Sequence, residues 1–269
     1  MPTLAGRGMR AVQASPFSTH LRVVGALLRR EMTTRYGRSA GGYFWAVAEP
    51  VGMVLMLALV FSAVAHAPPL GGSFVAFFST GYIAFSFYRA TAESMAGSLS
   101  ANFALLRFPN VSPYDAIVAR LILQSLTNVA VAMIVLGAAF TFTDEPVRLD
   151  HLRIVGALGA ATLLAAGVGA CNAVMFMVRP MWQRVFNIVN RPLFLVSGVF
   201  FLPESMPNEV QAALTWNPLV HVISALRVGM YPVYHARHDS LGYPAALGLG
   251  LLLLALLLLR RHRRRLSTP

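Results

Sequence analysis

The sequence predicts an all-α polytopic membrane protein with six transmembrane helices. Hydrophobic residues make up 57% of its 269 residues and charged residues only 12%, which is about half the charged share of a soluble domain. Apolar stretches that are long enough to cross a bilayer, which takes about 20 residues, recur along the chain. The arginines cluster between alternate stretches, as in proteins that cross the membrane several times.

The first 41 residues predict a cytosolic segment with an amphipathic helix over about 17–37. Apolar side chains recur there at helical spacing: Phe17, Leu21, Val24, Leu28 and Met32. Arg22, Arg29 and Arg30 occupy other faces, so the helix carries too much charge to span. We expect it to lie in the membrane interface; a cytosolic helix packed on a partner protein is the alternative.

The transmembrane domain is expected over 42–260, followed by a basic tail over 261–269. Five stretches are long and apolar enough to span, at about 43–65, 72–94, 114–142, 152–178 and 241–259. Another span is expected at about 185–201, where Arg191-Pro192 interrupts a shorter apolar run. The proline-rich segment 203–231 predicts re-entrant helices that dip back from the far side.

The arginine distribution predicts the orientation. Sixteen of the 22 arginines lie in the N-terminal segment, the 96–113 loop, the 179–191 region and the C-terminal run that begins at Arg260, and four lie in the loops 143–153 and 202–240. The positive-inside rule therefore places both termini in the cytosol. Because the arginine-rich tail directly follows an apolar helix, it indicates contact with anionic lipid and not with nucleic acid.

Charged and polar residues inside the spans are candidates for function. Arg89 and Glu93 are four residues apart, which predicts a pair on one helix face. Arg120, Gln124 and Asn128 form a polar stripe that serves either helix packing or a water-facing path. Arg120 could instead bond carbonyls of the cytosolic loop.

The fourth span predicts close helix packing. Its small residues allow two backbones to approach each other, within one chain or between subunits. They are Gly156, Gly159, Ala160, Gly167, Gly169 and Ala170.

The residues give no pattern for an enzyme. The chain has no lysine, and a P-loop requires one on the phosphates, so ATP hydrolysis would need another chain. His235, His238 and Asp239 are residue types that bind zinc, but within one short loop they are a weak signal. We therefore expect no catalytic site, no metal and no cofactor in this chain.

The 96–113 loop predicts a short amphipathic helix at about 98–107, with Leu99, Phe103 and Leu106 on one face. Ser112-Pro113 starts the next helix, where proline is tolerated. Such a helix suits docking into a groove of another protein; a simple connector is the alternative.

Three stretches resemble the membrane subunit of bacterial capsular polysaccharide exporters, in the ABC-2 permease family. They are LLRREMTTRYGRSAGGYFWAVAEP, FPNVSPYDAIVAR and NPLVHVISALR. The resemblance covers nearly the whole chain. It implies a homodimeric pore in the inner membrane above two copies of a separate ATPase subunit, which uses ATP and Mg. It also implies that the 98–107 loop is the coupling helix, through Leu99, Phe103, Leu106 and Arg107.

The same resemblance implies the cargo and the remaining partners. The exported glycan is expected to be acidic and lipid-linked, and periplasmic and outer-membrane proteins continue its path. Exporters of O-antigen or teichoic acid share the architecture and remain alternatives. From another class, a scaffold or transferase of glycan synthesis is the alternative; a transferase would need an acid/base cluster, and the sequence contains none.

The start of the first span predicts a cytosolic gate for this glycan. Arginine binds phosphate or carboxylate in bidentate geometry, and aromatic rings offer platforms for sugars. Gly41-Gly42 provides a hinge, and Pro50 interrupts the helix. An aromatic belt with a basic flank is the alternative. The candidate path residues are Arg29, Arg30, Arg35, Arg38, Tyr43, Trp45, Glu49 and Arg89.

Overall fold

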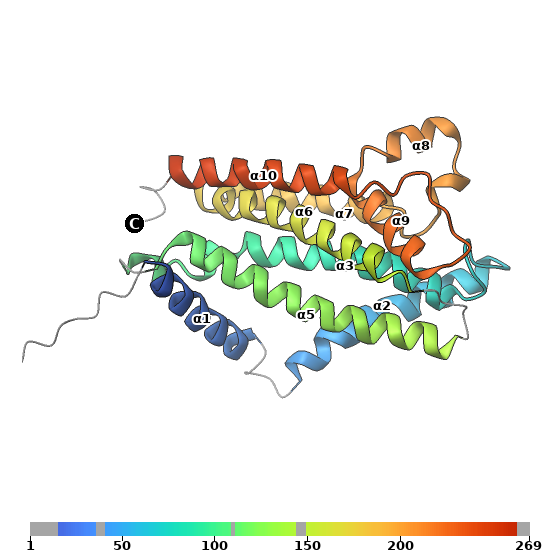
Figure 1. Cartoon of the computed structure of the whole chain (residues 1–269), viewed down its shortest axis with the longest axis horizontal. Helices are drawn as coiled ribbons and strands as arrows, with labels where there is room; N and C mark the ends of the chain where they lie inside the picture. The colour runs from blue at the N-terminus through green and yellow to red at the C-terminus, as the bar shows by residue number, and fades with distance from the viewer. Residues whose placement is uncertain (1–15, 36–40, 109–110, 144–148, 263–269) are drawn as a thin grey trace, which may run out of the picture.

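The computed structural model describes residues 16–35, 41–108, 111–143 and 149–262, which form helices and contain no strand (Figure 1). The longer helices are α1 (Pro16–Arg35), α2 (Gly42–Val64), α3 (Phe74–Ala96), α5 (Pro113–Phe142), α6 (His151–Val178), α7 (Met181–Leu195), α9 (Pro218–Met230) and α10 (Gly242–Arg261). The shorter elements are α4 (Ser98–Ala101), η1 (Leu105–Arg107), η2 (Pro203–Ser205) and α8 (Asn208–Leu214).

Helix α3 is the centre of the bundle. It packs on α2, α5, α6 and α9, and α6 in turn packs on α10, so the long helices lie side by side (Figure 1). A continuous core forms around the α3 aromatics Phe77, Phe78 and Phe85, which are fully buried. The helix α1 and the last turn of α10 lie at one end of the bundle, and α8 and α9 lie at the other.

Among the described residues, four helices are long and apolar enough to cross a membrane: α2, α5, α6 and α10. They match the spans predicted at 43–65, 114–142, 152–178 and 241–259. Helix α3 covers the stretch predicted at 72–94 and has 23 residues. Helix α3 is less apolar than these four because it carries Arg89 and Glu93. Other helices cover most of its surface.

The helix expected at 185–201 differs from the prediction. Helix α7 has only 15 residues, which gives a length of about 22 Å at 1.5 Å per residue, short of the roughly 30 Å of a bilayer core. The chain leaves the helix after Leu195, and Gly198 adopts a φ of 81° that favours glycine. The helix therefore does not cover 185–201: it begins four residues earlier and ends six residues earlier than predicted.

The segment after α7 is held in place by a buried arginine of α9. The Arg227 guanidinium donates to the carbonyl oxygens of Gly198, Val199 and Phe201 at 2.8, 3.1 and 3.2 Å. It also lies 4.2 Å from the centroid of the Phe77 ring. This arginine thus satisfies carbonyls that no helix or sheet satisfies, and it attaches residues 198–201 to α3.

The predicted close packing of the fourth span is confirmed. A Cβ added to Gly248 of α10 would lie 2.5 Å from the Leu163 backbone of α6, and Gly167 faces Gly248 in return. A Cβ added to Gly169 would likewise lie too close to Ala92 and to the Cβ of Met95 on α3. Gly159 differs, because a Cβ there would meet no atom within 4 Å.

Helix α1 packs against α5 at the end of the bundle where α10 finishes (Figure 1). Its buried side chains are Leu27 and Glu31, one turn apart, whereas Leu21 and Met32 of the predicted apolar face are exposed. The predicted helix is therefore present, and part of its apolar face is left uncovered by the rest of the chain; its place in the membrane interface stays a prediction.

Candidate functional site

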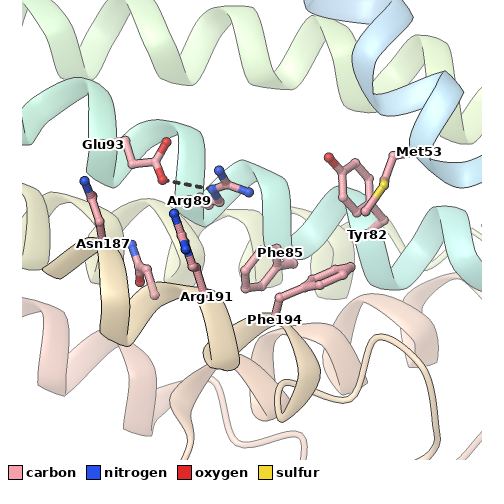
Figure 2. A pocket seen from close by; sticks show the side chains of 9 residues that line it. Met53, Tyr82, Phe85, Arg89, Glu93, Asn187, Arg191 and Phe194 are labelled. Atoms are coloured by element: carbon pink, nitrogen blue, oxygen red, sulfur yellow. Dashed lines mark hydrogen bonds and ion pairs between the residues drawn. The ribbon is translucent and has the colours of Figure 1, made fainter. Parts of the chain in front are cut away.

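A polar pocket of about 470 Å³ lies between α3 and α7, with one residue from α2. We call it the arginine pocket. Its lining residues are Met53, Tyr82, Phe85, Arg89, Glu93, Asn187, Asn190, Arg191 and Phe194. Figure 2 shows the charged and amide side chains at one end and the aromatic rings at the other.

The charged end joins two helices. The Arg89 Nε donates to Glu93 Oε1 at 2.9 Å, which confirms the pair predicted from their spacing. Arg191 extends from α7 toward this pair (Figure 2). In the part of the chain that the structure describes, no carboxylate pairs with Arg191. The lining therefore contains two guanidiniums and one carboxylate, which gives the pocket a net positive charge.

The amide and aromatic groups complete the lining. Asn187 and Asn190 both come from α7, and the Asn190 Nδ2 is buried without a partner among the described residues. The Phe194 ring lies 5.0 Å from Phe85 and 6.0 Å from Tyr82 between centroids. These rings form an apolar wall that faces the same space as the charges.

This chemistry suits the binding of an acidic sugar. A guanidinium can bind a carboxylate with two parallel hydrogen bonds, amides can donate and accept toward hydroxyls, and aromatic faces cover the apolar faces of sugar rings. The lining contains no serine, cysteine or histidine, so it holds no Ser–His or Cys–His pair. The described residues also contain no group of three or more potential metal ligands.

The predicted gate residues are not gathered at this pocket, apart from Arg89. Trp45 and Glu49 line a second, smaller pocket between α2, α3 and α5. Arg29 and Tyr43 are exposed. The side chain of Arg35 and the whole of Arg38 lie outside the described residues. The gate at the start of the first span therefore stays a prediction.

Arg30 instead belongs to a buried polar network. Its Nη1 donates to Asn102 Oδ1 at 2.7 Å, and Asn102 Nδ2 donates to Glu31 Oε1 at 3.2 Å. The same Glu31 oxygen accepts from Arg120 Nε at 3.1 Å. Arg120 Nη1 also reaches the Ser94 carbonyl at 2.9 Å. This Glu31–Arg120 network links α1, α3, α5 and the loop that follows α3.

The polar stripe on α5 packs helices together. Gln124 donates to Asn128 at 2.9 Å. Asn128 in turn donates to the Phe87 carbonyl and to the Thr91 hydroxyl of α3, at 3.1 and 3.0 Å. Arg120, through Glu31 and the Ser94 carbonyl, and Asn128 thus connect helices, whereas Gln124 supports Asn128 within α5; packing was one of the two interpretations of the stripe.

The loop after α3 is not the single amphipathic helix predicted at 98–107. It forms one turn, α4, and then η1, with Asn102 between them. Leu99 and Leu106 are buried in the chain's own core, so they cannot be the side chains that reach a partner. Arg107 is exposed and lies 5.3 Å from the Phe103 ring, and Phe108 is 60% exposed.

The weak metal signal has a structural explanation. Asp239 pairs with Arg153 of α6, across the loop that precedes α10. Arg153 also lies 3.9 Å from Asp150. These ion pairs attach the loop to the start of α6, which accounts for the acidic residue beside the two histidines.

The α7 residues of the arginine pocket were missed in the sequence. Asn187, Asn190, Arg191 and Phe194 follow the i, i+3, i+4, i+7 spacing of one helix face. That spacing was a usable signal. It was hidden because the apolar run at 185–201 was interpreted as a lipid-facing span and Arg191-Pro192 as an interruption.

Comparisons with known proteins identify relatives along most of the chain. Residues 22–231 match the family model of the ABC-2 type transporter. The chain is 32% identical over 235 residues to the polysialic acid transport protein KpsM of Escherichia coli, covering 87% of this chain and 91% of the relative. It is 30% identical to the capsule polysaccharide export inner-membrane protein CtrC of Neisseria meningitidis serogroup A and 28% identical to BexB of Haemophilus influenzae, which has the same description. Each of these two matches covers 86% of this chain and 88% of the relative.

Proposed function

This chain belongs to the ABC-2 type transporter family, and we propose that it is the transmembrane subunit of a capsular polysaccharide exporter in a bacterial inner membrane. The relatives named above are capsule export and polysialic acid transport proteins. A permease of this family works with an ATP-binding subunit, which would hydrolyse the ATP that this lysine-free chain has no P-loop to bind.

The arginine pocket is the observation that carries this proposal. Polysialic acid, the cargo named for two relatives, is a polymer of acidic sugars. Arg89 and Arg191 supply the cations that such carboxylates require, and Asn187 and Asn190 supply groups that bond hydroxyls. The aromatic wall adds a surface for the sugar rings. An acidic, lipid-linked glycan is therefore the cargo that fits this chain best.

The architecture of the working exporter forms part of the proposal. Two copies of this chain would enclose the path, with two copies of the ATPase subunit in the cytosol, using ATP and Mg. Both termini would be cytosolic, with six passages through the membrane if α3 and the α7 region are counted. Residues 203–231 would re-enter the membrane from the periplasmic side, where periplasmic and outer-membrane proteins would continue the path.

The exposure of the side chains on the cytosolic side indicates which of them would contact the ATPase subunit and the glycan. The loop over 98–107 would be the coupling element, but Arg107 and Phe108 would reach the ATPase, because Leu99 and Leu106 are buried. Arg29 of α1 and Tyr43 of α2, together with Arg35 and Arg38, would attract the acidic glycan at the membrane surface.

The test compares two arginine variants. Arg191→Gln removes a cation of the arginine pocket, whereas Arg22→Gln removes an exposed cation of α1. A hydrogen bond to a charged group contributes about 1.5–3 kcal/mol, so Arg191→Gln should reduce surface polysaccharide roughly tenfold or more, while Arg22→Gln should not. The readout is surface and intracellular polysaccharide in the native host, at equal amounts of each variant in the membrane.

Two outcomes would contradict the proposal. Unchanged surface polysaccharide in Arg191→Gln would remove the pocket from the path. A chain that copurifies with no ATPase, in a host that exports without one, would overturn the exporter itself and favour a scaffold of glycan synthesis.

A further inference from the structure

A second pocket lies beside the arginine pocket, on the neighbouring face of α3. It has a volume of about 290 Å³ and is formed by the first turns of α2 together with α3 and α5. We call it the Glu49 pocket. Its polar and aromatic lining residues are Trp45, Glu49, Tyr82, Ser86, Phe87, Gln124, Thr127 and Asn128. Tyr82 lines both pockets.

Glu49 is an ionisable residue on a helix that is apolar enough to span a membrane. It is exposed at the surface of the pocket, and among the described residues it has no ion pair or hydrogen bond through its carboxylate. The Arg89 guanidinium interacts electrostatically with Glu49, but its hydrogen bond is to Glu93 in the arginine pocket. A charge in a spanning helix is costly and indicates a functional contact.

Trp45 lies one helical turn before Glu49, so both side chains are on the same face of α2. Its indole is 67% exposed and contributes to the lining of the pocket. An indole face can cover the apolar face of a sugar ring, and a carboxylate accepts hydrogen bonds from hydroxyl groups. The two residues together therefore provide the contacts that a polyhydroxyl ring requires.

The far wall of this pocket is rigid. The bonds from Gln124 to Asn128, and from Asn128 to the Phe87 carbonyl and the Thr91 hydroxyl, join α5 to α3. Such a network positions polar groups before a ligand arrives, which reduces the entropic cost of binding. None of the lining residues is a cation, in contrast to the arginine pocket.

We propose that the Glu49 pocket is a second saccharide site, which binds an uncharged, hydroxyl-rich sugar. A sugar carboxylate would be repelled by Glu49 and would find no arginine in the lining, whereas neutral hydroxyls can donate to it. The volume lies at the lower end of the usual range of ligand pockets, about 300–1,000 Å³, and suits one or two sugar rings. This inference rests on the proposed export of a glycan and assigns its neutral sugars to a place distinct from its acidic ones.

Trp45 provides a direct reporter of this site. The chain has three tryptophans, so a Trp182→Phe/Trp216→Phe protein emits from Trp45 alone. The full-length protein in detergent micelles is titrated with three probes: maltotriose and chitotriose, which are neutral, and a sialic acid trimer, which is acidic. We expect a saturable change of Trp45 emission with at least one neutral probe and none with the acidic one.

Two variants control the experiment. Glu49→Ala in the Trp45-only protein should weaken neutral-sugar binding about tenfold, the loss expected for a hydrogen bond to a charged group. A Trp45→Phe/Trp182→Phe protein emits only from Trp216, which is on the α8–α9 turn and 80% exposed, and it should not respond to any probe.

The outcomes separate this inference from the export function. A lack of saturation with both neutral sugars, equal binding of the acidic trimer, or binding that survives Glu49→Ala would each overturn the inference. Deletion of the chain in the native host tests export separately, because normal surface polysaccharide without the chain would refute the exporter whatever the fluorescence shows.

Discussion

Replacing Glu31 with alanine should destabilise the protein more than any change to an exposed ion pair. Glu31 accepts hydrogen bonds from Arg120 and Asn102 on one carboxylate oxygen. The Glu31 and Arg120 side chains are only 7% and 11% exposed. Removing Glu31 therefore leaves a buried guanidinium without its counter-charge, and water has little access to replace it.

The magnitude follows from this burial. Removing one partner of a buried ion pair typically costs 3–5 kcal/mol. Arg120 keeps its bond to the Ser94 carbonyl, so we expect the lower end, about 3 kcal/mol. Glu93→Ala is the matched control, because its pair with Arg89 is 53% and 44% exposed; a helical surface pair of this kind contributes about 0.5 kcal/mol.

The assay is equilibrium unfolding of the purified chain in an SDS titration, which reports the free energy of unfolding of each variant. A Glu31→Ala/Arg120→Ala protein completes the cycle. It should be more stable than the sum of the two single changes predicts, by about 1 kcal/mol or more, because it leaves no unpaired charge. Equal losses for Glu31→Ala and Glu93→Ala would refute the assignment of a buried, stabilising pair.

Three further outcomes are expected from the packing. Gly248→Ala would place a Cβ 2.5 Å from the Leu163 backbone and should lower the free energy of unfolding by about 1–3 kcal/mol in the same SDS assay. Gly159→Ala is its control: a Cβ there faces open space, so the change should be neutral or should stabilise the protein by up to about 1 kcal/mol. Ser112→Ala removes the side-chain cap of α5 and should cost about 1 kcal/mol; no loss of SDS resistance would contradict the capping role. Arg227→Met releases the carbonyls of residues 198–201 and should speed proteolytic cleavage there, and an unchanged cleavage rate would contradict its role as their anchor.

The sequence was sufficient to predict the apolar helices because length and hydropathy decide whether a helix can cross a bilayer. The four predicted spans that match α2, α5, α6 and α10 depend only on these two properties. The Arg89–Glu93 pair and the close packing of Gly167 are equally local, since helical spacing and small size are visible in one segment.

Contacts between distant segments could not be predicted in this way. Glu31 and Arg120 are 89 residues apart, and nothing in either segment indicates that they meet. Arg227, 29 residues beyond Gly198, satisfies carbonyls of the segment that follows α7, and nothing in the sequence of that segment indicates this partner. The α7 side of the arginine pocket was missed for the same reason: an apolar segment with few polar residues matches a span until its neighbours are known.

The loop after α3 illustrates how burial changes a functional interpretation. Leu99 and Leu106 belong to the same buried cluster as Leu27 of α1 and Ile117 of α5, and Asn102 bonds both Glu31 and Arg30. Packed interiors of this kind deform little. A force that a partner applies at the exposed end of this loop would therefore move the loop, α1 and the start of α5 together. In an exporter driven by a separate ATPase, the arginine-rich α1 would then move with this loop, and the membrane surface that first meets the glycan would respond directly to ATP hydrolysis.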